Sequence, residues 1–180
     1  MTRPDRGKTI CFIDDSNIFH GSREAGWRVD WTKFDRYLEK SGPVWQTYFF
    51  TSVYEPPSPE QEAFINRLKE NLRWEVVTYE LGKRTVRCTN CGHSETVPTE
   101  KGVDVGLAIK MLSLAVNQAM ETAILVAGDR DYLETVETVK GFGIRVEVIA
   151  WRRALSQDLA LESSEEVIYI DNLRKEIGRD

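Results

Sequence analysis

The sequence has no long apolar run, and this absence limits the classes of protein that it can encode. No stretch approaches the roughly 20 apolar residues that a membrane-spanning helix needs. The opening residues, MTRPDRGK, also lack the apolar stretch of a secretory signal, so we expect a cytoplasmic protein with no membrane partner. The P-loop, the G-x-S-x-G elbow and the G-x-G-x-x-G turn are missing as well. An NTPase, a serine hydrolase and a dinucleotide enzyme are therefore unsupported.

Cysteine is scarce, and there is no excess of positive charge. Only three cysteines occur in 180 residues, and two of them share a C-T-N-C motif. This usage suits a reducing compartment and a metal knuckle better than a disulfide framework. The formal net charge of -5 gives the chain no overall attraction to nucleic acid, which counts against a pure binding module. It does not exclude a nuclease, because carboxylates that hold divalent cations are neutralised by the metal in use.

What the sequence does contain is a regular alternation of apolar strands and helices. Strands are expected at 9–13, 45–54, 74–81, 123–128, 144–150 and 166–171. Helices are expected at 30–41, 58–73, 103–116, 131–140 and 154–161. The helix at 103–116 is apolar around almost its whole circumference, which predicts packing on several sides in the interior. The alternation predicts an α/β fold of three αβα layers with a mostly parallel central sheet.

Acidic residues follow two of the expected strands, at the edge where open parallel sheets bind their ligands. Asp14 comes after CFI, Asp129 and Asp131 come after ILVAG, and Asp104 opens the apolar helix. Carboxylates that meet in one crevice repel one another unless a cation neutralises them. Their convergence predicts Mg²⁺ or Mn²⁺, which prefer such oxygen ligands. A metal-bound water can attack a phosphodiester while metal charge stabilises the leaving oxygen.

Each acid also has a structural interpretation. Asp129 or Asp131 could cap the helix that follows, and Asp131 with Glu134 resembles a capping box. Asp104 could likewise be a helix cap, and residues 14–17 could form a polar turn. For any one acid taken alone, the cap is favoured, because Asp is a common capping residue. Taken together, at the mouths of separate elements, the acids favour the metal site.

Three segments resemble the NYN domains of the PIN-like nuclease superfamily, in particular the LabA-like branch. They are FIDDSNIFHG (12–21), EKGVDVGLAIKML (100–112) and ILVAGDRDYLETVE (124–137). The resemblance spans nearly the whole chain and implies a sheet of about five parallel strands. It implies a single PIN-like NYN domain over 8–173, with 1–7 and 174–180 as tails. It also implies a Mg²⁺- or Mn²⁺-dependent ribonuclease whose partner is RNA, with single-stranded RNA the expected substrate.

The resemblance assigns roles to individual residues. Asp14 matches the first-strand acid of the family and Asn17 its paired asparagine. Asp104 matches the acid of the KGVD segment, while Asp129 and Asp131 match the two acids of the G-D-x-D turn. Asp14, Asp104 and Asp129 are expected to hold the metal. Asp131 is expected to act as an outer ligand or water-orienting base, and Asn17 to orient a ligand or phosphate.

One departure from the family pattern concerns the first strand. The family usually has Gly after the first acid, where this chain has Asp15, which could add a ligand or crowd the site. Two alternative functions stay open. The fold could serve as a non-catalytic regulatory domain that binds RNA, nucleotide or protein. The same acids could also serve a metal-dependent phosphatase.

A second candidate metal site lies in the expected insertion at 82–99, which has the pattern of a β-hairpin. Cys88, Cys91 and His93 form C-x-x-C-x-H, in which the two thiolates have the spacing of a zinc knuckle. Structural Zn²⁺ is almost always four-coordinate, so a partner chain, a more distant acid or a water must complete the site. The alternative is an ordinary turn with two reduced cysteines and no metal. The hairpin is compatible with a homodimer. Its basic residues form either a solvated face or an arm for RNA; they are Lys83, Arg84 and Arg87, with Lys101 following.

Overall fold

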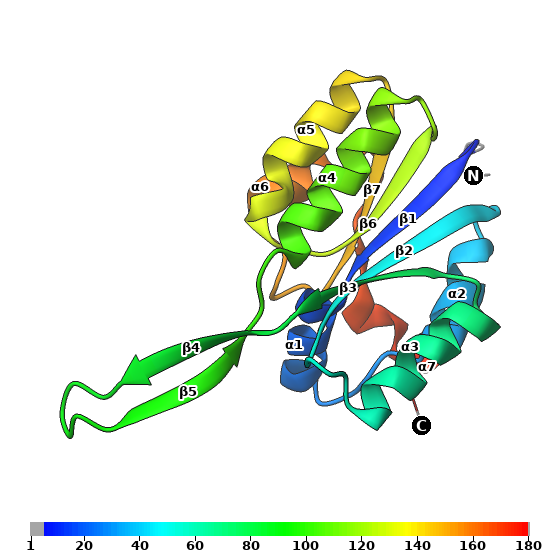
Figure 1. Cartoon of the computed structure of the whole chain (residues 1–180). Helices are drawn as coiled ribbons and strands as arrows, with labels where there is room; N and C mark the ends of the chain where they lie inside the picture. The colour runs from blue at the N-terminus through cyan, green and yellow to red at the C-terminus, as the bar shows by residue number, and fades with distance from the viewer. Residues whose placement is uncertain (1–5, 180) are drawn as a thin grey trace.

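Six strands form one parallel sheet in the computed structural model, which describes residues 6–179. The sheet has the order β3-β2-β1-β6-β7-β8, and each neighbouring pair runs parallel (Figure 1). Its strands are β1 (Thr9–Asp14), β2 (Val44–Val53), β3 (Glu75–Glu80), β6 (Thr122–Val126), β7 (Arg145–Ala150) and β8 (Ile168–Tyr169). The predicted strand at 166–171 is thus only two residues long.

Helices cover both faces of this sheet. One face packs against α4 (Val103–Val116), α5 (Leu133–Gly141) and α6 (Gln157–Glu162). The other packs against α1 (Asp15–Ala25), α2 (Trp31–Glu39), α3 (Pro59–Asn71) and α7 (Arg174–Ile177). Two short 3₁₀ helices follow β6 and β8; they are η1 (Arg130–Tyr132) and η2 (Ile170–Leu173). These layers confirm the predicted three-layer α/β fold.

The central strand shows why the sequence folds this way. β1 is buried along its whole length, as expected for a continuous apolar run in a parallel sheet. Successive side chains of a strand point to opposite faces. Ile10 and Phe12 therefore join the core under α4 and α5, whereas Cys11 and Ile13 join the core under α1 and α2. Burial also raises the pKa of the Cys11 thiol, which is consistent with its role as a small core residue.

The caps of two helices agree with the sequence. Asp30 accepts hydrogen bonds from the backbone N–H groups of Thr32 and Lys33 at the start of α2. Ser58 caps α3 in a capping box with Gln61, and a proline occupies the first helical position. These local signals therefore fix where both helices begin.

The environment of α4 differs from the prediction. Its buried side chains lie on one face, at Val103, Leu107, Met111 and Ala115. On the outer face Val105 and Ile109 are 56% and 62% exposed. The prediction of a helix packed on several sides is wrong, because α4 belongs to an outer layer and meets the sheet on one side only.

The chain ends also differ from the predicted tails at 1–7 and 174–180. Residues 174–177 form α7, Ile177 is fully buried, and its carbonyl accepts the N–H of Asp30. Arg6 is buried as well. Residues 1–5 and 180 lie outside the described part. Among the residues described, no helix is long and apolar enough to cross a membrane.

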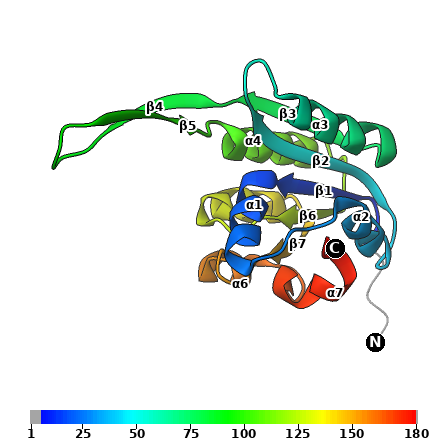
Figure 2. The same ribbon diagram turned by 90° about the horizontal axis from the view of Figure 1, so that it is seen from below.

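A two-stranded antiparallel hairpin projects from the three layers (Figures 1 and 2). It consists of β4 (Gly82–Arg87) and β5 (Ser94–Thr99), inserted between β3 and α4. This confirms the predicted hairpin insertion. The turn at its tip carries the two cysteines of the C-T-N-C motif.

Candidate functional site

The candidate site lies where the topology of the sheet switches direction. β1 sits between β2 and β6, so the chain leaves it toward one side of the sheet and later returns on the other. Ligand crevices of open α/β sheets form at such points, outside the carboxyl ends of the strands. Asp14 is the last residue of β1, and Asp129 follows shortly after β6. The sequence therefore places two of its predicted acids at this crevice.

Asp14 is the most constrained of the acids. Its side chain is almost buried, with 7% of the residue exposed. One carboxylate oxygen accepts the backbone N–H of Asn17 at 3.1 Å, which caps α1, and the other accepts the Tyr132 hydroxyl at 2.7 Å. Burial raises the pKa of Asp14, the nearby carboxylates of Glu100 and Asp129 raise it further, and the two hydrogen bonds oppose these effects.

Asn17 ties α1 to the turn that carries Asp129. Its side-chain oxygen accepts the backbone N–H of Gly128 at 3.1 Å. A larger residue would not fit in place of Gly128, because its Cβ would lie 2.6 Å from the carbonyl oxygen of Ala154. The Gly128 carbonyl also accepts the N–H of Ser156 at 2.9 Å. Asn17 and Gly128 thus position Asp129 relative to Asp14.

Asp14, Asn17 and Asp129 line one cavity of about 220 Å³. His20 and Arg153 line it as well. Arg153 brings a guanidinium, a group that binds phosphate well, to the same cavity as the two carboxylates. The cavity therefore combines groups for a cation with a group for an anion.

Tyr132 links a third predicted acid to the site. Burial raises the pKa of the Tyr132 hydroxyl above its usual range, and the charges of Asp14, Asp104 and Asp129 raise it further. All three carboxylates therefore act on one buried hydroxyl. Asp104 lies in the first turn of α4, where Gly102 is the N-cap and no side chain caps the helix. The capping interpretation of Asp104 is therefore wrong.

Asp131 occupies a different position. It is exposed in η1, and its backbone N–H donates to Asp129 at 3.2 Å. Asp129 is thus the cap of η1, and α5 has no side-chain cap, so the capping box with Glu134 is not formed. Asp131 is also not among the carboxylates that act on Asp14 or Tyr132. Its predicted role at the metal consequently has the weakest structural support.

Sequence reasoning missed three residues of the site, Arg153, Tyr132 and Glu100. Tyr132 directly follows the G-D-x-D turn, and this adjacency was the available signal. Glu100 lies in the connection from the hairpin to α4, where it accepts a hydrogen bond from the Ser16 hydroxyl and acts electrostatically on Asp14. It begins the EKGVD segment, so its closeness to Asp104 in the sequence was the signal that could have pointed to it. Its contact with α1 depends on the fold.

Asp15 and Asp14 line two different cavities. It lines a cavity of about 360 Å³ with Phe19, Trp31 and Phe64, and accepts the Thr51 hydroxyl at 2.7 Å. Burial raises the pKa of Asp15 to about 7, with a smaller contribution from the charges of Asp14 and Glu100. The substitution of Asp for the usual Gly therefore adds a partly buried acid beside the site.

Asp15 should make the metal-free protein less stable as pH rises. Its pKa of about 7 in the folded chain lies above the ordinary value of 3.8 for an aspartate, so folded protein holds a proton that unfolded protein releases. This stabilisation is complete at low pH and is lost as pH rises through 7.

Relative to Asp15→Asn, the wild type should lose roughly 2–3 kcal/mol of its free energy of unfolding between pH 5 and pH 8. Guanidinium unfolding in EDTA measures this difference. A parallel pH dependence in both proteins would contradict it, and exposed Asp131→Asn is the control.

The donor set at the crevice fits a hard divalent cation. Asp14 and Asp129 provide two carboxylates in one cavity, and Mg²⁺ takes one or two carboxylates while keeping several waters. A bound cation would also relieve the repulsion that raises the pKa of Asp14. Within residues 6–179 as placed, no three His, Cys, Asp or Glu side chains gather closely enough to hold a metal by themselves. Waters or substrate oxygens must therefore supply the other positions.

The predicted zinc motif also lacks a group of three ligands among the described residues. Cys88 and Cys91 are both exposed at the hairpin tip. Hydrogen bonds from the backbone of Cys91 and Asn90 lower the pKa of the Cys88 thiol. The carbonyl of His93 accepts the N–H of Cys88 at 2.7 Å and so closes the hairpin. In the described chain, the His93 side chain does not complete a three-ligand group with the two cysteines.

Comparison with known proteins supports both the family and the fold. The sequence model of the NYN domain matches residues 8–171. A search of curated proteins found no match. A crystal structure of a protein of unknown function from Vibrio parahaemolyticus is similar, with a TM-score of 0.74 and 21% identity over 99% of this chain and 100% of that one. At this identity the likeness shows the fold alone. Phosphofructokinase-2 from Escherichia coli reaches a TM-score of only 0.38, with 16% identity over 79% of this chain and 54% of that one.

Proposed function

The chain belongs to the NYN domain family, and from that premise we propose that it is a divalent-metal-dependent ribonuclease acting on single-stranded RNA. The family is generally nuclease-like. The observation that carries the proposal is the pairing of buried Asp14 with Asp129 in one cavity at the switch point of the sheet. Asp104 adds a third charge at the same buried hydroxyl, so the crevice is strongly negative and suited to a cation.

Each residue has a role in this proposal. Asp14, Asp129 and Asp104 hold Mg²⁺ or Mn²⁺ directly or through water, and Asp131 is an outer group at the rim. The metal, when bound, activates water for attack on phosphorus and stabilises the leaving oxygen. Tyr132 holds the Asp14 carboxylate in place through its hydrogen bond. The remaining roles are those of Asn17, which fixes the Asp129 turn, and Arg153, which binds substrate phosphate.

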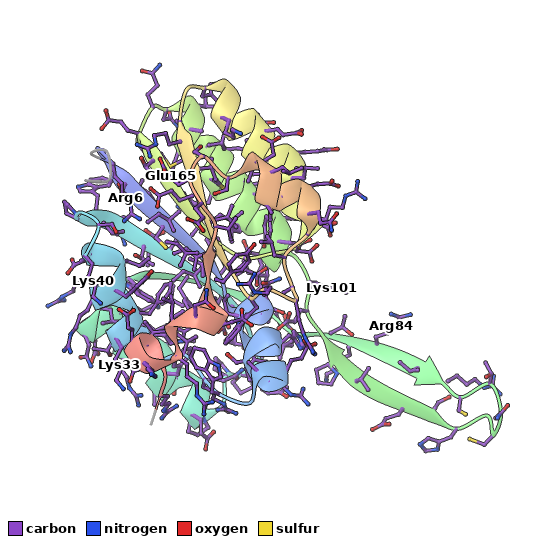
Figure 3. The ribbon with its side chains drawn as sticks, turned by 180° about the vertical axis from the view of Figure 1, so that it is seen from behind. Arg6, Lys33, Lys40, Arg84, Lys101 and Glu165 are labelled. Carbon is purple, nitrogen blue, oxygen red and sulfur yellow. The ribbon has the colours of Figure 1, made fainter. Side chains whose placement is uncertain are left out.

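The hairpin offers a path for the RNA backbone toward this site. Arg84 lies on the hairpin and Lys101 at its base, next to Glu100 (Figure 3). Lys83 and Arg87 add two further positive charges to β4. Such side chains bind phosphate without regard to sequence, and their contribution weakens as salt rises. We therefore assign the basic residues of the hairpin to non-specific RNA contacts. Membership of the LabA-like branch stays a prediction.

Purified protein should cleave labelled single-stranded RNA in Mn²⁺ or Mg²⁺ and stop when EDTA is added. The reason is that the carboxylates supply binding for the cation, while the cation supplies the reactive water. Gel analysis of end-labelled RNA measures the reaction, with double-stranded RNA of the same sequence for comparison. RNA that is bound but left intact in Mn²⁺ would favour the non-catalytic regulatory domain instead. Hydrolysis of a chromogenic phosphomonoester without RNA cleavage would favour a phosphatase.

A further inference from the structure

The hairpin tip holds a preformed pair of thiols that the proposed nuclease site does not use. The N–H of Cys88 donates to the carbonyl of His93 at 2.7 Å, and the N–H of Gly92 donates to the carbonyl of Cys88 at 3.0 Å. Gly92 has a φ of +71°, a backbone conformation that favours glycine, which lets the chain reverse directly after Cys91. Cys88 and Cys91 are both exposed in this turn. This turn presents both sulfurs at the end of the hairpin.

Such a turn supplies half of a tetrahedral zinc site. Two cysteines separated by two residues have the spacing of a zinc knuckle, and a structural Zn²⁺ takes four ligands. The hairpin carries the pair away from the three layers (Figures 1 and 2). The same projection leaves the tip accessible to another chain.

We propose that one Zn²⁺ joins two copies of this chain, bound by Cys88 and Cys91 of each copy where the two hairpin tips meet. Four thiolates around Zn²⁺ carry a net negative charge. Arg87 offsets it, since its guanidinium lies 3.8 Å from where a Cβ of Gly92 would sit. Each copy brings one such guanidinium to the junction.

The charges of the hairpin make this association depend on the metal. Over 82–99, three basic residues stand against one acid, Glu95. Two hairpins brought together would therefore repel one another unless thiolates and a metal lay between them. A two-stranded hairpin is also only marginally stable by itself. Zinc at the tip fixes its turn and pairs it with an equivalent hairpin.

Zinc content and mass of the full chain test the proposal together. With ZnCl₂ added and the excess removed, we expect about half a zinc ion per chain and the mass of a dimer by light scattering. Cobalt substitution should give intense thiolate-to-metal charge-transfer absorption. Cys88→Ser and Cys91→Ser should each lose zinc and elute as monomers. His93→Ala is the matched control, since it alters the same turn and should keep both zinc and dimer.

Other outcomes would overturn the proposal. One zinc per monomeric chain, lost in His93→Ala, would assign the metal to a single chain with His93 as a ligand. A dimer that persists in EDTA and in Cys88→Ser would show that zinc does not hold the copies together, and absence of bound zinc would remove the site. None of these readouts involves RNA cleavage. Failure of the nuclease proposal therefore leaves this inference standing, and the reverse also holds.

Discussion

Asp14→Asn is expected to lower the rate of metal-dependent RNA cleavage by about a thousandfold while the protein stays folded. The substitution keeps the size of the side chain and the ability to cap α1, because Asn is as good an N-cap as Asp. It removes the one buried negative charge at the crevice. Metal stabilisation of a phosphoryl transition state contributes several kcal/mol, and about 1.36 kcal/mol corresponds to a factor of ten in rate.

Cleavage rates at saturating Mn²⁺ measure this effect, with circular dichroism as the check on folding. Glu137→Gln provides the matched control, since Glu137 is exposed on α5 and has no role at the crevice. Asp129→Asn should follow Asp14→Asn closely, whereas Asp131→Asn should cost less because Asp131 does not act on Asp14. A folded Asp14→Asn variant that cleaves RNA at the wild-type rate would remove the assignment of Asp14.

The fold and the main acids could be predicted because local patterns determine them. A continuous apolar run such as TICFI has few stable places other than the centre of a parallel sheet. The carboxyl ends of parallel strands lie at one edge, so acids after two such runs lie at the same edge of the sheet. This reasoning placed Asp14 and Asp129 correctly in one cavity. It required no knowledge of the connections between the strands.

What could not be predicted depends on which elements meet in space. The helix α1 starts directly after β1, because Asp14 both ends the strand and caps the helix, and its sequence gave no strong helical signal. Glu100 reaches Ser16 only through the path from the hairpin to α4. The exposed apolar face of α4 could not be predicted either. The helix is apolar on all sides, so its composition does not show which side packs against the sheet.

The buried ion pair of Arg6 and Glu147 is the strongest example of such a non-local feature. The two residues are 141 positions apart, in a segment expected to be a tail and in a strand. Both are 5% exposed. Two hydrogen bonds of 2.9 and 2.5 Å join the guanidinium to the carboxylate, and Arg6 also donates to the carbonyl of Leu38 at 3.2 Å. The pair therefore fastens the start of the chain to β7 and to the end of α2.

Glu147→Ala is expected to destabilise the protein by about 3–5 kcal/mol, because it leaves the buried Arg6 guanidinium without its counter-charge. The melting temperature should fall by roughly 6–20 °C in a chain of this size. Guanidinium or thermal unfolding measures the change. Glu165→Ala is the control, since Glu165 pairs with Arg145 nearer the surface, where such a pair contributes about 0–1 kcal/mol. Figure 3 marks Arg6 and Glu165.

A double variant shows whether Glu147→Ala loses stability because Arg6 is left unpaired or because packing is lost. Arg6→Met with Glu147→Leu replaces both charges by apolar groups of similar length, and such replacements of buried pairs are often neutral or stabilising. We therefore expect the double variant to unfold at a clearly higher denaturant concentration than Glu147→Ala does. If it were as unstable as the single variant, the cost would come from packing around β7 and not from the stranded charge. A Glu147→Ala protein as stable as Glu165→Ala would show that water reaches Arg6 and that the pair contributes little.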